Sequence, residues 1–98
     1  MIKVRTKSGF VCEVDPERAK DWRFCKALAK CDSQDESELI QGMTFVVSFL
    51  LGKDEDKLIE HISKNNNGLA PVDKIIEEFK EILVEMGKEV KKSQSSQE

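Results

Sequence analysis

The chain has 98 residues, of which 39% are hydrophobic and 36% charged, and its net charge is −3. This length suits one domain with a modest core, and the apolar content is too high for a disordered chain. The acidic balance argues against a general nucleic-acid-binding protein, which needs a basic patch to pair with phosphates. The longest apolar run, at residues 43–51, is far shorter than the roughly 20 residues that cross a bilayer, so no membrane contact is expected.

Charge is divided unevenly along the chain. Residues 1–31 contain eight Lys or Arg and four Asp or Glu, a net charge of +4, whereas residues 32–98 contain eight and fifteen, a net charge of −7. The basic N-terminal third leaves nucleic-acid binding open as an alternative. The plainer interpretation is that the two parts attract each other, within one fold or between subunits. Together with a surplus of apolar residues, this asymmetry predicts a homo-oligomer.

The three cysteines, Cys12, Cys25 and Cys31, have no CxxC spacing, and no secretory signal pattern precedes them. We therefore expect free thiols and a cytoplasmic location. Cys12 and Cys25 fall on apolar stripes and are predicted to be small core residues.

Residues 2–6 and 10–14 are predicted to form a β-hairpin. Apolar and polar residues alternate with period two on both sides of a turn that contains Gly9. Because an isolated hairpin is marginal in water, its apolar face must pack on another part of the protein.

Two helices are predicted next, at about residues 16–30 and 34–51. Asp15 and Pro16 suit the start of the first helix, whose core-facing stripe is expected to be Trp22, Cys25, Leu28 and Ala29. The second is predicted to start near Ser33 with a capping box and to end at Gly52. Its apolar residues cover most of its circumference, which is typical of a central helix.

Two further helices are predicted at about residues 54–64 and 71–91. The shorter one is expected to turn Leu58, Ile59 and Ile62 inward. The longer one has the most regular periodicity in the chain, with an apolar stripe of Val72, Ile75, Ile76, Phe79, Ile82, Leu83, Met86 and Val90. Residues 93–98 are predicted to be a disordered tail. The fold class is therefore mainly α (α+β), an N-terminal hairpin followed by about four helices packed as a small bundle, in a single domain over residues 1–92.

The sequence contains no recognisable catalytic or metal-binding pattern. His61 is the only histidine, and the spacing of Cys25 and Cys31 does not form a zinc motif. The acidic residues 54–56 lack the spacing and the glycine of an EF-hand loop, and no glycine-rich phosphate loop is present. A cysteine nucleophile with His61 as its base is the one enzymatic alternative. We expect no enzyme, no cofactor and no metal.

The long apolar stripes are the most informative feature. Burying one large apolar side chain stabilises a protein by about 1.5–3 kcal/mol, so the eight stripe residues represent on the order of 12–24 kcal/mol as an upper bound. Burial of the apolar residues within 39–51 would contribute a similar free energy. The two helices either pack on each other within the monomer, or part of the last helix faces a partner or a second subunit. The eight residues of the stripe are thus the candidate partner-binding surface.

Three features follow one another along the chain. The first is the opening strand pair, residues 1–15. The second is Lys20-Asp21-Trp22-Arg23 with Ala27-Leu28-Ala29, followed by an acidic segment and Leu50-Leu51-Gly52-Lys53. The third is the Asn67-Gly68 break before Pro71-Val72 and an amphipathic helix that ends in Lys91-Lys92-Ser93. In these features, over residues 1 to about 93, the sequence resembles the small tail assembly chaperones of long-tailed phages and prophages of Gram-positive hosts. Cys25 and Cys31 depart from the expected pattern.

The resemblance implies a non-enzymatic function. Such chaperones hold the long tape measure protein, which is helical and prone to aggregation, and help to recruit tail tube protein around it. Many are also made in a longer form by ribosomal frameshifting, and the polar segment after Ser93 would suit such a junction. The alternative is a small helical adaptor or regulatory protein that associates with nucleic acid through its basic N-terminal third.

Overall fold

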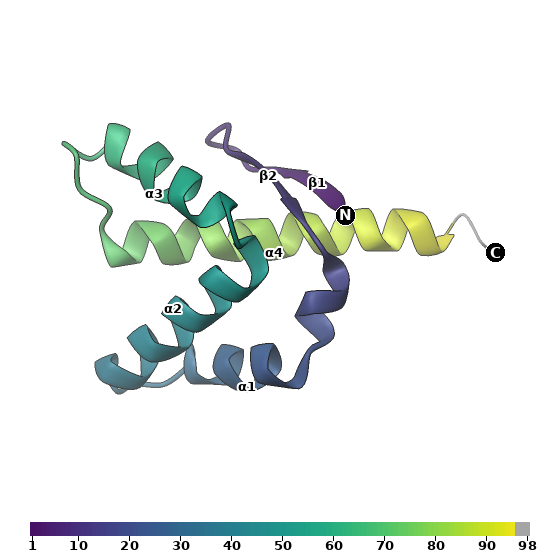
Figure 1. Ribbon diagram of the computed structural model, residues 1–98, viewed down its shortest axis with the longest axis horizontal. Helices are drawn as coiled ribbons and strands as arrows, with labels where there is room; N and C mark the ends of the chain where they lie inside the picture. Colours follow the sequence, from purple (N-terminus) through teal and green to yellow (C-terminus); the bar gives the residue numbers. More distant parts are fainter. Residues whose placement is uncertain (96–98) are drawn as a thin grey trace.

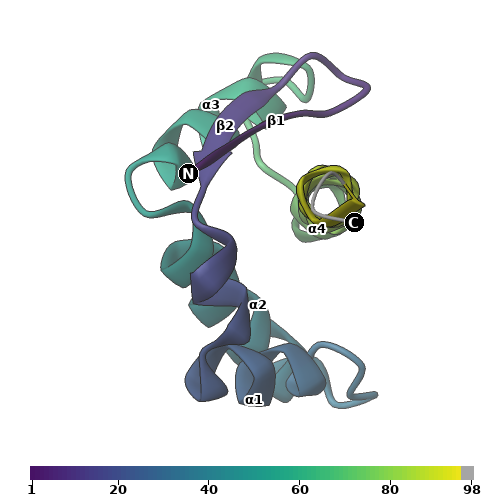
Figure 2. The same cartoon turned by 90° about the vertical axis from the view of Figure 1, so that its right-hand side faces the viewer.

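The computed structural model describes residues 1–95 of the chain. Its elements are β1 (Ile2–Arg5), β2 (Val11–Val14), a 3-10 helix η1 (Pro16–Lys20), α1 (Trp22–Lys30), α2 (Glu36–Leu51), α3 (Asp54–Lys64) and α4 (Val72–Ser95). In Figure 1 the hairpin and α3 lie above the long α4, and α1 and α2 lie below it. Figure 2, with α4 seen end-on, shows α1 and α2 extending away from the hairpin and α3. The predicted fold class, a hairpin followed by four helices, is confirmed.

The hairpin forms where the alternating pattern predicts it. Its strands pair antiparallel, with Val4 opposite Cys12. The Gly9 N–H donates to the Thr6 carbonyl at 3.0 Å, and the Thr6 N–H donates to the Phe10 carbonyl at 2.9 Å. Gly9 has a φ of +93°, a conformation that side chains disfavour, which explains the glycine at the end of this turn. The buried face of the hairpin packs against the rest of the core, as its marginal stability requires.

The single helix predicted over residues 16–30 is wrong, because the chain bends at Asp21. Asp15 caps η1 by accepting from the Glu17 N–H. Asp21 is extended, with φ −66° and ψ 137°, and its carboxylate accepts from the Arg23 N–H at 2.8 Å to cap α1. Two aspartates thus start two short helices where the sequence pattern indicates one.

The break also changes which face of α1 is buried. The buried and half-buried residues are Phe24, Ala27, Leu28 and Cys31, whereas Trp22 is 78% exposed and Cys25 is exposed. The prediction that Cys25 belongs to the core is therefore wrong, and the prediction for Cys12 is confirmed. Both stripes have helical spacing, so periodicity alone could not decide between them.

The start of α2 differs from the predicted capping box. Asp35, not Ser33, caps the helix by accepting from the Ser37 N–H at 2.9 Å. Gly42 then lies against α1 so closely that a Cβ atom there would come within 2.6 Å of the Ala27 carbonyl oxygen. Glycine at this position permits the close crossing of α1 and α2.

The later helices follow the prediction more closely. The bounds of α3 match residues 54–64, and the turn after it contains Asn67 and Gly68 with positive φ values. The last helix begins at Val72 and continues to Ser95, past the expected end at residue 91. The predicted disordered tail is therefore helical over residues 93–95, and the remainder of that tail lies outside the described residues.

All the long elements contribute to one core. Its most deeply buried members come from the hairpin and from α1 to α4, and they include Val4, Val14, Phe24, Val46, Leu58, Phe79 and Ile82. Within residues 1–95, no helix combines the length and the apolar character needed to span a membrane.

Candidate protein-binding groove

The apolar stripe of α4 is divided between the interior and the surface. Phe79, Ile82 and Met86 are buried in the core of the chain itself. Four of the other residues are half-buried, and of these Ile75, Ile76 and Leu83 pack against that core, while the fourth is Val90. Val72, at the start of the helix, is 50% exposed. The middle of the stripe therefore holds the monomer together, and mainly its N-terminal end is left for a partner.

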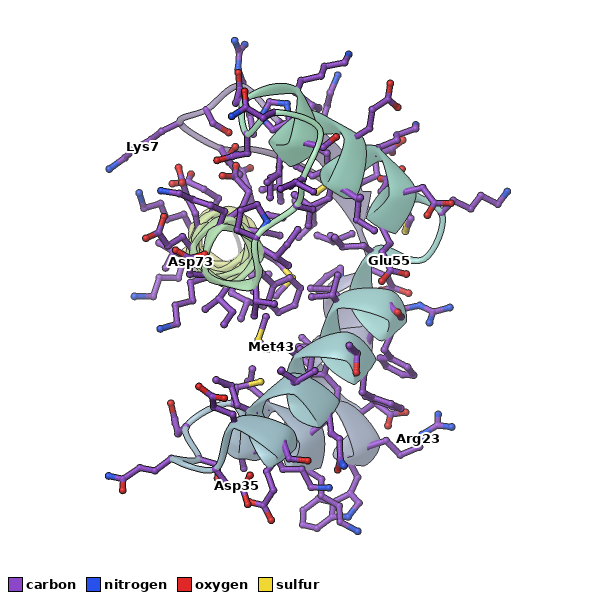
Figure 3. All side chains as sticks on the ribbon, turned by 90° about the vertical axis from the view of Figure 1, so that its left-hand side faces the viewer. Lys7, Arg23, Asp35, Met43, Glu55 and Asp73 are labelled. Atoms are coloured by element: carbon purple, nitrogen blue, oxygen red, sulfur yellow. The ribbon has the colours of Figure 1, made fainter. Side chains whose placement is uncertain are left out.

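That end of α4 forms one wall of an apolar groove. The groove lies where α2, α3 and α4 meet and has a volume of about 220 Å³. Its lining residues, of which only Thr44 and Glu55 are polar, are Ile40, Met43, Thr44, Val47, Glu55, Leu58, Ile59, Ala70, Val72, Ile75 and Ile76. Figure 3 looks onto this end of the molecule, where Met43 points from α2 toward α4.

The groove has a firm floor and an accessible rim. Met43, Val47 and Leu58 are almost fully buried and belong to the core, so the floor is part of the packed interior. On the rim, each of the three helices contributes one aliphatic side chain that is about half exposed, namely Ile40, Ile59 and Val72. Ile59 was expected to face the core, and this prediction is wrong. A rim of this kind is the surface that an apolar partner would cover.

Glu55 is the only ionisable residue that lines the groove. The Ser48 hydroxyl lies 2.9 Å from both of its carboxylate oxygens, which links the end of α2 to the start of α3. A carboxylate is also favourable in the first turn of a helix. The groove is thus apolar along its length, with the Glu55 carboxylate at its edge.

The opposite face of α2 has a different chemistry. The rings of Phe45 and Phe49 stack with centroids 5.4 Å apart, and the guanidinium groups of Arg18 and Arg23 lie 5.2 and 5.3 Å from the Phe49 centroid. Arg18 also donates to the Phe49 carbonyl, and Arg23 pairs with Asp21 at 3.0 Å. Two basic side chains of the N-terminal third are therefore engaged within the protein.

His61 belongs to a polar cluster that joins the hairpin turn to two helices. The Ser8 hydroxyl donates to Glu78 of α4 at 2.7 Å and lies 2.9 Å from the His61 Nε2 of α3. The Lys7 N–H donates to Glu81, also on α4. In a nucleophilic site the histidine would take the serine proton, whereas here that proton points to a carboxylate. The arrangement links the hairpin turn to α3 and α4.

The thiols are not brought together with this histidine. Cys25 and Cys31 donate to the backbone carbonyls of Ala19 and Ala27. Burial, with the nearby charge of Asp54 as a second cause, raises the pKa of Cys12 to about 11, and burial also raises the pKa of Cys31. A raised pKa keeps a thiol protonated at neutral pH, which is the reverse of what a nucleophilic cysteine needs.

No group of three or more His, Cys, Asp or Glu side chains within the described part of the chain is placed to hold a metal ion. Fold and groove together define a small, mainly helical domain with an apolar groove where α2, α3 and α4 meet. Comparisons of the chain with known protein families, with curated proteins and with solved structures found no significant match.

Proposed function

We propose that this protein is a non-enzymatic tail assembly chaperone of a long-tailed phage. It binds the tape measure protein in the host cytoplasm and assists assembly of the tail tube around it. The observation that supports this proposal is the apolar groove, whose half-exposed rim residues come from three different helices. A protein that holds helical clients needs such a surface, and the resemblance in the order of the sequence motifs points the same way.

The size of the groove favours weak, repeated binding. Covering the exposed halves of three aliphatic side chains contributes on the order of 2–4 kcal/mol before any cost of association. One groove therefore holds a client loosely, at best near the millimolar range of dissociation constants. Several copies on one long client would raise the overall affinity by many-fold. Weak binding at several sites agrees with the predicted homo-oligomer and suits a client that must later be released to the tail tube.

Co-expression with the tape measure protein of the same phage tests the function. We expect the tape measure protein to become soluble and to elute together with this chain in size-exclusion chromatography. Light scattering on the complex and on the isolated chain gives the number of copies in each. If the tape measure protein stays insoluble and no complex elutes, the proposed function is wrong.

The second candidate function is a regulatory or adaptor protein that binds nucleic acid through its basic N-terminal third. Its support is Trp22, which is 78% exposed on a helix that also carries the exposed Lys26 and Lys30. Exposed aromatic rings beside basic groups can stack with unpaired bases. Because Trp22 is the only tryptophan in the chain, its fluorescence reports such binding directly. We expect no change on titration with single-stranded DNA or RNA at low salt, whereas a salt-sensitive change would favour this second function.

A further inference from the structure

We infer that the groove takes an amphipathic helix whose apolar stripe is flanked by lysine or arginine. The identity of the client as a phage protein rests on the proposed function, but the chemistry of the segment is inferred from the groove itself. Apolar side chains spaced three and four residues apart would lie on the rim formed by Ile40, Ile59 and Val72. Basic side chains beside that stripe would then meet the acidic surroundings of the groove.

The part of the chain that builds the groove is strongly acidic. Residues 32–78 contain eleven Asp or Glu and four Lys or Arg, a net charge of −7. Three of those four basic residues already have acidic partners in the fold, because Lys57 lies 3.5 Å from Asp54, Lys64 lies 3.8 Å from Glu60, and Lys74 lies 3.8 Å from Glu77. The remaining carboxylates therefore dominate the charge that a partner meets.

Three of these carboxylates lie within four residues of the rim residues along the chain. Helical spacing places Glu36 one turn before Ile40 on α2 and Asp56 one turn before Ile59 on α3. Asp73 is the neighbour of Val72 at the start of α4. All three acids are exposed, and the ion pairs found within residues 1–95 do not include them. Each exposed aliphatic residue of the rim thus has a carboxylate close to it.

The helix dipoles do not cancel this charge. Each of the three helix N-termini contributes about +0.5 of an elementary charge, so together they contribute about +1.5. The first turns of the same helices carry six carboxylates, Glu36, Glu38, Asp54, Glu55, Asp56 and Asp73. With Lys53, Lys57 and Lys74 at the same helix starts also counted, the surroundings of the groove keep a net charge of about −1.5, so an acidic helix is repelled and a basic one is attracted.

Two labelled synthetic peptides test the inference on the full chain. Both carry leucines at the same helical spacing, and the flanking positions are all lysine in one and all glutamate in the other. We expect fluorescence anisotropy at about 0.05 M salt to show at least about tenfold tighter binding of the lysine peptide. The difference should shrink at about 0.5 M salt, where screening shortens the range of the charges. Exchanging Glu36, Asp56 and Asp73 together for Gln, Asn and Asn should reduce it in the same way.

A matched pair of variants on α4 locates the binding site. Val72→Gln removes a rim residue, whereas Val84→Gln changes the same residue type on the same helix outside the groove, and these valines are 50% and 57% exposed. We expect Val72→Gln to weaken binding of the lysine peptide about fivefold or more and Val84→Gln to leave it unchanged. Similar losses in both variants would mean attraction to a general acidic surface and would overturn the inference.

The remaining outcomes separate this inference from the proposed function. If neither peptide binds but the chain still forms a complex with the tape measure protein, the inference about the groove is wrong and the function stands. If the lysine peptide binds at the groove but no complex forms, the function is wrong and the inference stands. Equal binding of the two peptides overturns the inference. The inference is also overturned if the chain forms a homo-oligomer that competes with the peptide and dissociates in the Val72→Gln variant. In that case a second copy of the chain occupies the groove.

Discussion

The two longest helices, α2 and α4, use their apolar residues in different ways. On α4 these residues form one stripe, and the middle of that stripe, with Phe79 and Ile82, is buried in the core. On α2 they surround the helix, so that Val46 and Leu50 enter the core, while Ile40 and Phe45 stay 45% and 38% exposed on two different faces.

The difference shows what a regular apolar stripe predicts. A strongly amphipathic helix buries its apolar face as soon as the rest of its own chain offers a partner surface. A helix that is apolar on all sides cannot bury every face in a small domain, and the remaining faces lie at the surface. The candidate binding surface therefore lies at the start of α4 together with α2 and α3, and does not extend along the whole of α4.

The largest effect should come from the buried part of the α4 stripe. We expect Phe79→Ala, at a residue that is 1% exposed, to lower the free energy of unfolding by about 3–5 kcal/mol, since it removes a large core side chain and leaves a cavity. Val84→Ala, on the exposed side of the same helix, should change it by less than about 0.5 kcal/mol. Urea denaturation measures both. A loss below about 1 kcal/mol for Phe79→Ala would show that the stripe does not hold the monomer together and is available to a partner.

A smaller effect should distinguish the two helices through their glycines. Gly42→Ala on α2 would bring a methyl group within 2.6 Å of the Ala27 carbonyl oxygen and 2.9 Å of the Lys30 Cβ. Because a backbone oxygen cannot move aside cheaply, we expect a loss of about 1–3 kcal/mol in stability. Gly87→Ala on α4 meets no atom within 4 Å and should instead stabilise the helix by about 0.5–1 kcal/mol.

The two glycine substitutions are expected to change stability in opposite directions, which makes their comparison a stringent test. Both substitutions add the same methyl group to a helix, so only the surroundings differ. If Gly42→Ala stabilised the protein as Gly87→Ala should, then α1 and α2 would not cross as closely as they do in the fold described above. Thermal unfolding followed by circular dichroism decides the sign for each variant.

Much of the fold could be predicted from local patterns. The hairpin, the bounds of α3 and the end of α2 at Gly52 depend on strand alternation and turn residues, which act within a few positions of the chain. The buried face of α1 could not be predicted, because two stripes of helical spacing compete in its sequence. Tertiary contact chooses the one with Ala27, whose backbone carbonyl lies against Gly42 of α2. The groove could not be predicted either, since its walls are three helices separated in sequence and brought together only by the core.

The smallest expected effect concerns the start of α1, the helix that covers one face of α2. The Asp21 carboxylate accepts from the Arg23 side chain and backbone, and these hydrogen bonds lower its pKa from 3.8 to about 2. Because the pKa is lower in the folded state, the pair stabilises the protein above about pH 4, and this contribution is lost as the pH falls through about 2. The Asp21 side chain is half-buried but its Arg23 partner is 70% exposed, so salt screens the contribution and keeps it small.

Asp21→Asn keeps a side chain that can cap the helix but removes the charge. We therefore expect it to reduce stability slightly at neutral pH and to flatten the loss of stability between about pH 4 and pH 2. Arg23→Gln should flatten the same loss of stability at low pH, and the double variant should flatten it no further, because both changes remove the same ion pair. At neutral pH, Arg23→Gln should also lose the contact of Arg23 with the Phe49 ring. Urea midpoints measured across this pH range test the expectation. If stability falls as steeply with pH in Asp21→Asn as in the unchanged chain, the ion pair contributes nothing to the stability of α1.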